Sequence, residues 1–397
     1  MSGSELLPKK EANVLKGHEG AVLAARFNRD GNYCLSCGKD RTIRLWNPYR
    51  GIHIKTYKSH GREVRDVHVT PDNSKLCSCG GDRQVFYWDV STGHVIRKFR
   101  GHDSEVNAVK FNHHAAVVVS AGYDRSVRAW DCRSHSTEPI QACCLFFYSV
   151  MSLCLTQSEI LAGSVDGSVR TFDIRLGREI SDNLGQPVNC VSLSNDGNCV
   201  LAGCLDSTLR LLDRTTGELL QEYKGHTCKS YKTDCCLTNS DAHVVSGSED
   251  GSVFFWDLVD ASVISSFRAH SSVVTSVSYH PIDCCMITSS VDGTIRVWNA
   301  SNSCEVGREY LQTQTVVTKG MTESNYPELK RLERRFWGCR PSLAHLQPPQ
   351  RDMSCVSNSD QRLWPWLKES CASSMAFLVR FGMSRQRRLR WWWFLYF

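Results

Sequence analysis

The chain has 397 residues, of which 41% are hydrophobic and 22% are charged, and its formal charge is +6. Its N-terminal sequence has no apolar core of signal-peptide length, and no run approaches the ~20 apolar residues that span a bilayer. These features argue against the secreted and membrane-spanning classes, and we expect a soluble, intracellular globular protein.

The positive charge is concentrated near the C-terminus. Residues 301–397 contain 15 basic and 8 acidic side chains, a balance of +7, so residues 1–300 carry −1 of the +6 total. A near-neutral body does not present the broad basic field of a protein that follows phosphate backbones. Direct nucleic-acid binding by residues 1–300 is therefore not expected. RNA binding through a local patch stays open as an alternative function.

The 20 cysteines do not indicate a disulfide framework. Many lie inside predicted strands, and without a secretion signal we expect reduced, mostly buried thiols. Cys34 with Cys37, and Cys77 with Cys79, have no partner pair at zinc-ligand spacing. No Gly-rich phosphate loop accompanies them either. We expect neither a metal nor a cofactor.

In chain order, the first predicted strand lies around Val14 and Leu15. Units of 40 to 44 residues follow, each closed by an aromatic residue and Asp or Asn. The six regular closing pairs are Trp46-Asn47, Trp88-Asp89, Trp130-Asp131, Phe172-Asp173, Trp256-Asp257 and Trp298-Asn299. The fifth unit closes with the degenerate pair Leu212-Asp213. A period of this length, with Gly-His near the start and Trp-Asp at the end, predicts four strands per unit arranged as propeller blades.

Each unit contains three predicted strands before its closing pair and an outer strand after it. In the third unit the three strands lie around residues 106–111, 117–120 and 127–130. The outer strands that follow closing pairs lie at residues 53–57, 95–99, 138–142, 178–182, 219–223 and 263–267. The first strand therefore completes the last blade and closes the ring, which removes open sheet edges.

We thus predict an all-β, seven-bladed β-propeller over residues 11–300, after an N-terminal arm at residues 1–10. Residues 301–397 form a basic, aromatic tail without a helical or strand period, and we expect it to be disordered or an alternative C-terminus. An aromatic, basic tail could also contact RNA or a membrane surface.

Three residue types change together along the repeats. Units 4 and 5 lack the His, the hydroxyl and the Trp that accompany the Asp of the second hairpin in the other units. This joint loss indicates one hydrogen-bonded group, because a buried carboxylate is unfavourable unless donors satisfy it. Five complete structural tetrads are predicted: His18, Ser36, Asp40 and Trp46; His60, Ser78, Asp82 and Trp88; His102, Ser120, Asp124 and Trp130; His226, Ser246, Asp250 and Trp256; His270, Thr288, Asp292 and Trp298.

A hydrolase triad is the alternative interpretation of Asp, His and Ser. We do not favour it, because the constellation recurs five times, its Asp lies in a hairpin turn, and no nucleophile elbow accompanies it. We expect no enzymatic activity.

The combination of Gly-His, hairpin Asp and Trp-Asp resembles the WD-repeat β-propellers over about three quarters of the chain. Longer strings, at residues 31–35, 97–102, 160–167, 205–213 and 253–259, resemble a WD-repeat subfamily of scaffolds that organise mitogen-activated protein kinases. This resemblance implies a non-catalytic organiser of the extracellular-signal-regulated kinase cascade, monomeric within larger complexes. It also implies an association with the spliceosome and a location in both cytoplasm and nucleus. The chain departs from that subfamily after residue 300, where its members end.

In WD-repeat propellers, the residues that face one surface lie just before the hairpin Asp and at two positions early in the first strand. Carrying these positions over to this chain gives charged, amide and aromatic candidates for partner binding: Lys39, Glu63, Arg65, Glu105, Asn107, Tyr123, Asn189, Lys232 and Glu249. Arg65 and Tyr123 are the best anchors, because Arg and Tyr are enriched at binding hot spots.

A second function is suggested by the residues after two closing pairs. Trp130-Asp131-Cys132-Arg133, and more weakly Phe172-Asp173-Ile174-Arg175, resemble the Trp-Asp-x-Arg motif of substrate receptors for cullin ubiquitin ligases. Arg133 and Arg175 are therefore candidate contacts for a ligase adaptor. Only the Arg is informative, since the Trp-Asp pair is structural in any case.

Overall fold

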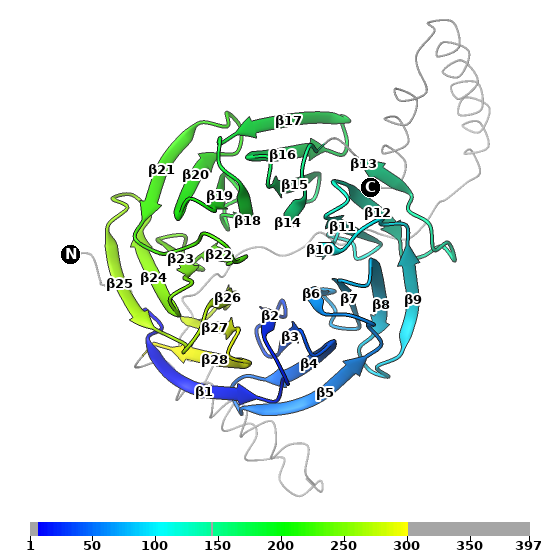
Figure 1. Ribbon diagram of the computed structural model, residues 1–397, viewed down its shortest axis with the longest axis horizontal. Helices are drawn as coiled ribbons and strands as arrows, with labels where there is room; N and C mark the ends of the chain where they lie inside the picture. The colour runs from blue at the N-terminus through cyan, green and yellow to red at the C-terminus, as the bar shows by residue number, and fades with distance from the viewer. Residues whose placement is uncertain (1–6, 144–145, 301–397) are drawn as a thin grey trace, which may run out of the picture. The chain divides into compact units, whose positions relative to one another are not determined.

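The structure, a computed structural model, describes residues 7–143 and 146–300 (Figure 1). Within these residues, 28 strands form seven four-stranded antiparallel sheets arranged as a ring of blades. The predicted all-β, seven-bladed propeller is confirmed. The predicted tail at residues 301–397 and the first six residues of the predicted arm lie outside the described residues.

Each blade runs from an inner strand beside the central axis to an outer strand at the rim (Figure 1). Blade 1 contains β2 (Val22–Phe27), β3 (Cys34–Gly38), β4 (Thr42–Asn47) and β5 (Ile52–Lys58). Blade 2 contains β6 (Val64–Val69), β7 (Lys75–Gly80), β8 (Gln84–Asp89) and β9 (Val95–Arg100). Blade 3 contains β10 (Val106–Phe111), β11 (Val117–Gly122), β12 (Val127–Asp131) and β13 (Gln141–Cys143).

The remaining four blades repeat this order. Blade 4 contains β14 (Val150–Leu155), β15 (Glu159–Ser164), β16 (Ser168–Asp173) and β17 (Arg178–Asn183). Blade 5 contains β18 (Val188–Leu193), β19 (Cys199–Cys204), β20 (Thr208–Asp213) and β21 (Leu219–Lys224). Blade 6 contains β22 (Cys235–Leu237), β23 (His243–Gly247), β24 (Ser252–Asp257) and β25 (Val263–Arg268). Blade 7 contains β26 (Val274–Tyr279), β27 (Cys285–Ser290), β28 (Thr294–Asn299) and β1 (Lys10–Lys16).

The N-terminal strand closes the ring as predicted. β1 pairs antiparallel with β28, with Leu15 opposite Ile295 and Glu11 opposite Trp298. Glu11 also pairs with Arg296 at 2.6 Å. The predicted arm is shorter than residues 1–10, because β1 begins at Lys10 and Leu7 is buried in the apolar cluster between blades 6 and 7.

One predicted outer strand is shorter than expected. The strand predicted at residues 138–142 is observed only at β13, and Pro139 lies in the turn before it. Proline has no N–H to donate to a sheet ladder, which explains the late start. The Ile140 N–H still donates to the Ala129 carbonyl at 2.8 Å.

The hydrophobic core is divided among the seven contacts between neighbouring blades. For example, Tyr57 and Leu35 of blade 1 pack with Phe86 and Trp88 of blade 2. A comparable buried cluster joins each other neighbouring pair, including blades 7 and 1. Cys34 and Cys37 belong to clusters on opposite faces of β3, and burial raises the pKa of both thiols.

Two sets of turns define one face of the ring. The hairpins between the second and third strands of each blade, and the turns that lead into each inner strand, lie on one face, which we call the hairpin face. The opposite face carries the remaining turns. No helix among the described residues is long and apolar enough to cross a membrane.

Candidate protein-interaction site

Hydrogen-bonded tetrads join the hairpin face to the third strand in blades 1, 2, 3 and 7. In blade 3, His102 Nδ1 lies 2.7 Å from Asp124 Oδ2, His102 Nε2 lies 2.7 Å from Ser120 Oγ, and Trp130 Nε1 donates to Ser120 Oγ at 2.8 Å. The same contacts join His18, Ser36, Asp40 and Trp46; His60, Ser78, Asp82 and Trp88; and His270, Thr288, Asp292 and Trp298. The serine hydroxyl is inaccessible in each case that contains one.

The tetrad carboxylates are held in the ionised form. Burial alone would raise the pKa of Asp124, but hydrogen bonds from His102 and Ser126 lower that pKa to about 2. The pKa values of Asp40, Asp82 and Asp292 are lowered in the same way, against the effect of burial. This arrangement stabilises the hairpins and leaves no exposed nucleophile, in agreement with a structural role.

The tetrad predicted in blade 6 is wrong. Trp256 Nε1 donates instead to the Lys224 carbonyl at 3.0 Å, and Ser246 Oγ donates to the Gly247 carbonyl at 3.0 Å. His226 Nδ1 is buried without a hydrogen-bond partner among the described residues, while Asp250 is exposed and accepts the Ser252 N–H at 2.8 Å.

Two extra residues in the turn before β22 explain this difference. The tetrad His and Asp are 22 residues apart in the four blades that form a tetrad, whereas His226 and Asp250 are 24 apart. The longer turn is held by Glu249 Oε1, which accepts the N–H groups of Lys229, Ser230 and Tyr231 at 2.7, 2.6 and 2.9 Å. The unequal spacing was the sequence signal for this departure.

In blades 4 and 5, which lack the tetrad histidine, the hairpin Asp still pairs with an arginine four residues after it. Arg170 lies 3.4 Å from Asp166 Oδ2, and Arg210 lies 2.7 Å from Asp206 Oδ2. These guanidinium groups also pair with Glu179 and Glu222 of the adjacent outer strands. The same pair joins Arg44 to Asp40 in blade 1 and Arg128 to Asp124 in blade 3, so it does not depend on the loss of the histidine. The sequence interpretation missed these pairs, although the regular Asp-to-Arg spacing could have indicated them.

Arg65 is the centre of the predicted partner-binding residues on the hairpin face. Its guanidinium donates to Glu63 at 3.0 Å, to Asn107 Oδ1 at 2.7 Å and to Glu105. The Arg65 Cζ atom lies 5.1 Å from the centre of the Tyr123 ring, whose side chain is 41% exposed. Blades 2 and 3 thus present one preformed cluster of charged and aromatic groups.

Other predicted positions are unsuitable for direct contact with a partner. Asn107 and Asn189 are buried and tie neighbouring blades, donating to the carbonyls of Val150 and Tyr231 at 2.9 Å. Glu249 is engaged by its own turn, as described above. Lys39 differs from these three residues, because it is exposed on the hairpin face and accessible to a partner.

The assignment of Lys232 was wrong by one residue. Cys235 pairs with Ser246 as Ala25 pairs with Ser36, so Lys232 corresponds to Val22. The two surface positions early in the first strand are occupied in blade 6 by Tyr231 and Thr233. Lys232 Nζ instead donates to the carbonyls of Asn107 and Met151 at 3.2 and 2.7 Å, on the far side of the central axis.

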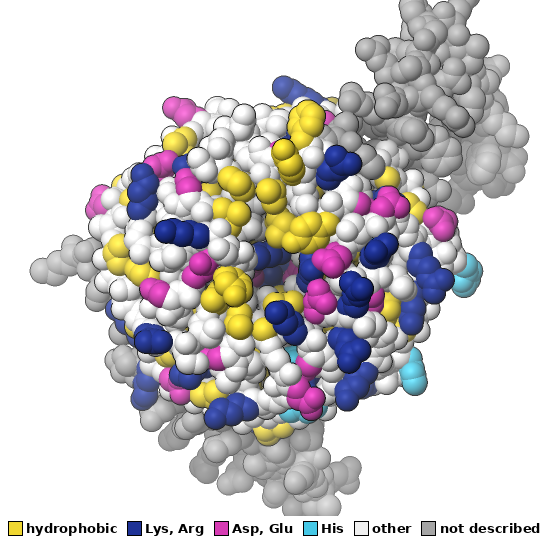
Figure 2. Space-filling view, viewed as in Figure 1, with side chains coloured by type: hydrophobic (Ala, Val, Ile, Leu, Met, Phe, Trp, Pro, Cys, Tyr) yellow, Lys and Arg dark blue, Asp and Glu magenta, His cyan; other side chains and the backbone are white. Residues whose placement is uncertain are grey.

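Exposed aromatic residues were also missed. Phe147 and Tyr148, in the turn that leads to β14, are 74% and 62% exposed. Figure 2 shows hydrophobic side chains gathered beside the central opening over blade 4, with acidic and basic side chains over blades 2 and 3. None of the nine candidate positions carried over from the family lies in this turn, so the family pattern offered no reason to select its tip.

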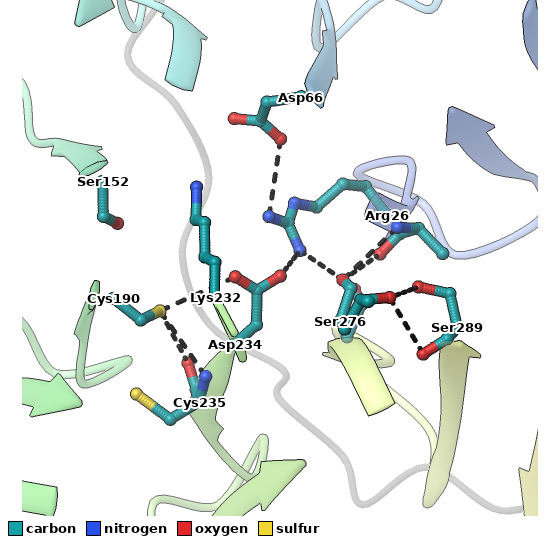
Figure 3. Close-up of polar contacts among 12 residues, drawn as sticks. Arg26, Asp66, Ser152, Cys190, Lys232, Asp234, Cys235, Ser276 and Ser289 are labelled. Atoms are coloured by element: carbon teal, nitrogen blue, oxygen red, sulfur yellow. Dashed lines mark hydrogen bonds and ion pairs between the residues drawn. The ribbon is translucent and has the colours of Figure 1, made fainter. Parts of the chain in front are cut away.

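A charged network crosses the central axis (Figure 3). Arg26 of blade 1 donates to Asp234 of blade 6 at 2.5 Å and to Ser276 of blade 7 at 2.8 Å, and it pairs with Asp66 of blade 2 at 3.4 Å. Burial alone would raise the pKa of Asp66, but Lys110, Arg26 and Lys232 lower it to about 2. These contacts join blades 1, 2, 6 and 7 at the central axis.

The comparisons with known proteins agree with this architecture. The family model described as WD domain, G-beta repeat, matches residues 9–47, 51–89, 93–131, 178–213, 217–257 and 261–299. The chain belongs to the WD-repeat family. The matched ranges leave out residues 132–177, which include the WD repeat that has Phe172 in place of Trp.

Relatives of this WD-repeat chain extend over most of its length. WD repeat domain-containing protein 83 of Rattus norvegicus is 59% identical over 292 residues, which cover 74% of this chain and 92% of the rat protein. The protein of the same name from Homo sapiens is 55% identical with the same coverage. A homologue from Dictyostelium discoideum is 34% identical over 316 residues, covering 72% of this chain and 97% of the relative.

The two arginines of the Trp-Asp-x-Arg motif lie on the opposite face of the WD-repeat propeller. The side chains of Arg133 and Arg175 are 64% and 71% exposed. In each case the backbone N–H of the arginine donates to the Asp side chain two residues earlier, at 2.9 Å for Asp131 and 2.8 Å for Asp173. The turn is therefore fixed while the guanidinium remains accessible.

Proposed function

We propose that this WD-repeat protein is a non-catalytic scaffold that brings components of the extracellular-signal-regulated kinase cascade together. The observation that carries the proposal is the preformed cluster of Glu63, Arg65, Glu105 and Tyr123 at the surface of two neighbouring blades. Arg and Tyr are common binding hot spots, and their mutual contacts reduce the entropy lost when a partner binds. The assignment to this cascade comes from the sequence resemblance.

The test replaces both anchors in the full-length protein. Arg65→Ala combined with Tyr123→Ala should reduce the recovery of kinase-cascade proteins in affinity purification. A matched control is Arg29→Ala with Tyr33→Ala, because Arg29 is exposed and Tyr33 is 40% exposed on the opposite face. Unchanged recovery in the Arg65/Tyr123 variant, with an intact fold by circular dichroism, would reject this surface.

The same purification tests the proposed association with the spliceosome and the proposed presence in both cytoplasm and nucleus. Extracts of the two compartments are purified separately, and the partners are identified by mass spectrometry. Recovery of splicing proteins from the nuclear extract, reduced by the same double substitution, would support a second role for this surface.

The alternative function is that of a substrate receptor for a cullin ubiquitin ligase. It is favoured by the accessible guanidinium groups of Arg133 and Arg175 after a fixed turn. Arg133→Ala with Arg175→Ala should then abolish co-purification of the cullin adaptor and leave binding through the hairpin face unchanged. Absence of the adaptor from the wild-type purification would eliminate this alternative.

A further inference from the structure

Three consecutive hairpins on the hairpin face carry arginine where the backbone favours glycine. Arg41, Arg83 and Arg125 follow the hairpin Asp of blades 1, 2 and 3 with φ angles of 63°, 63° and 62°. Blades 4, 6 and 7 have glycine at the same position, with φ angles of 85°, 87° and 83°: Gly167, Gly251 and Gly293. A residue with a Cβ atom is strained in this left-handed region. We call Arg41, Arg83 and Arg125 the arginine arc.

The side chains of the arginine arc are available to a partner. All three residues are exposed, and none has an ion pair or a side-chain hydrogen bond within the described ranges. Two neighbouring arginines of blades 2 and 3 are, in contrast, engaged within the propeller: Arg128 pairs with Asp124 at 3.3 Å, and Arg65 pairs with Glu63 and Glu105. Backbone strain combined with unpaired charge offers the fold no benefit, which points to a role in binding.

The surroundings of the arginine arc add positive charge. Lys39 is exposed beside Arg41, and the Arg62 side chain is 65% exposed, 3.8 Å from Glu105. Figure 2 shows Lys and Arg side chains gathered over blades 1 to 3 on the face in view. The nearby carboxylates of Glu63 and Glu105 are engaged by Arg65, and that of Asp103 is engaged by Arg128.

We infer that the arginine arc binds an extended anionic segment of a partner protein, with carboxylate or phosphate side chains opposite the three guanidinium groups. This inference rests on the proposed scaffold function and specifies the chemistry of the partner. Arginine matches both anions through paired N–H donors. Tyr123, which precedes Asp124 in the third hairpin, gives the segment an apolar contact next to Arg125.

A peptide fits this surface better than a nucleic acid. Glu19, Glu63, Asp103 and Glu105 are interspersed among the basic residues and would repel a continuous phosphate backbone. A peptide can place neutral or basic side chains opposite these carboxylates. The charge balance of −1 for residues 1–300 also argues against binding a polyanion.

The experiment measures fluorescence anisotropy of labelled probes with the full-length protein. The probe is a fluorescein-labelled peptide of alternating Glu and Tyr with about 12 residues, roughly 40 Å long when extended. A Lys-Tyr peptide of equal length tests the sign of the charge. Arg41→Gly, Arg83→Gly and Arg125→Gly are combined in one variant, which relieves the backbone strain and so preserves folding.

A second variant carries Arg41→Gln, Arg83→Gln and Arg125→Gln. It removes the three charges, while each position still holds a residue with a Cβ atom in the left-handed backbone conformation. The control variant combines Lys10→Gln, Arg29→Gln and Arg178→Gln, which removes three exposed charges from the opposite face. All variants retain the basic residues 301–397, so any binding to that segment is common to them and cancels in the comparison.

We expect both arc variants to weaken binding of the Glu-Tyr peptide about tenfold, and the control variant to change it less than about twofold. Binding should also weaken with added NaCl. Equal affinity of the wild-type and arc variants would overturn the inference. Displacement of the peptide by oligouridylate RNA, with tighter RNA binding that depends on the arc, would assign the surface to nucleic acid instead.

Comparing the Arg65/Tyr123 variant with the arc variants separates the scaffold proposal from the anionic-segment inference. If the Arg65/Tyr123 substitutions abolish partner recovery while the arc variants bind the Glu-Tyr peptide like the wild type, the scaffold function stands and the anionic-segment inference fails. If the arc variants lose the peptide while the Arg65/Tyr123 variant recovers all partners, the basic surface is established without the proposed anchors.

Discussion

The most direct test of the tetrads compares two buried serines at equivalent positions. Ser120 Oγ is the shared partner of Trp130 Nε1 and His102 Nε2, whereas Ser246 Oγ donates only to the Gly247 carbonyl among the described residues. Ser120→Ala leaves two buried polar atoms unsatisfied, each worth about 1–3 kcal/mol, so we expect a loss of about 2–6 kcal/mol. Ser246→Ala should reduce stability by only about 0.5–1.5 kcal/mol.

The assay is urea unfolding of the purified full-length variants, followed by circular dichroism. Both substitutions remove one hydroxyl from a fully buried serine in the second strand of a blade, so they differ mainly in the partners lost. The dependence of the unfolding free energy on urea should stay constant, which shows that the same surface unfolds in both variants. Thermal unfolding should give the same order, with roughly 2–4 °C for each kcal/mol.

Equal destabilisation by the two substitutions would refute this reasoning. It would mean that Ser246 takes part in a tetrad with His226 and Trp256, despite the two extra residues in the preceding turn. Shortening that turn by two residues offers the converse experiment. If the turn length causes the difference, a shortened turn should make Ser246→Ala as unfavourable as Ser120→Ala.

Further predictions concern strain, pH and local opening. Arg83→Gly should raise the unfolding free energy by about 1 kcal/mol because it relieves a left-handed backbone, whereas Arg62→Gly should not; urea unfolding distinguishes them. Asp66, with a folded pKa of about 2 against an ordinary value of 3.8, stabilises the fold above about pH 4. That contribution, about 2 kcal/mol, should be lost as pH falls toward 2, and Asp66→Asn should flatten the fall in the urea midpoint. Amide hydrogens of blades 4 and 5, and also of blade 6, should exchange faster than those of blades 2 and 3 when followed by mass spectrometry. Equal protection would contradict the role given to the tetrads.

The regular part of the fold follows from local patterns in the sequence. The spacing of the closing pairs, from Trp46-Asn47 to Trp298-Asn299, locates every blade, and counting outer strands shows that β1 must complete blade 7. Such features are visible because each repeat is one supersecondary unit with the same strand order. The failure of the blade 6 tetrad was also readable in principle, since the His226-to-Asp250 separation exceeds the others by two residues.

The central network could not be predicted from the sequence. Arg26 and Asp234 are separated by 208 residues, and they meet only because the ring brings blades 1 and 6 to the same axis. An isolated Arg or Asp in an inner strand has no local pattern that identifies its partner. The left-handed backbone of Arg41, Arg83 and Arg125 was hidden for a similar reason, because arginine at this position gives no turn signal of the kind that glycine gives.

The placement of the tetrads bears on how the surface would bind. The arginine arc and the cluster of Glu63, Arg65, Glu105 and Tyr123 lie on blades 1 to 3. Each of these blades has a tetrad that ties its hairpin to the third strand. A hairpin held in this way loses little conformational freedom when a partner binds, so more of the contact energy appears as affinity. Breaking the blade 3 tetrad with Ser120→Ala should therefore weaken binding of the Glu-Tyr peptide without touching a guanidinium group. Ser246→Ala should leave that affinity unchanged, and an equal effect of the two substitutions would show that hairpin rigidity does not contribute.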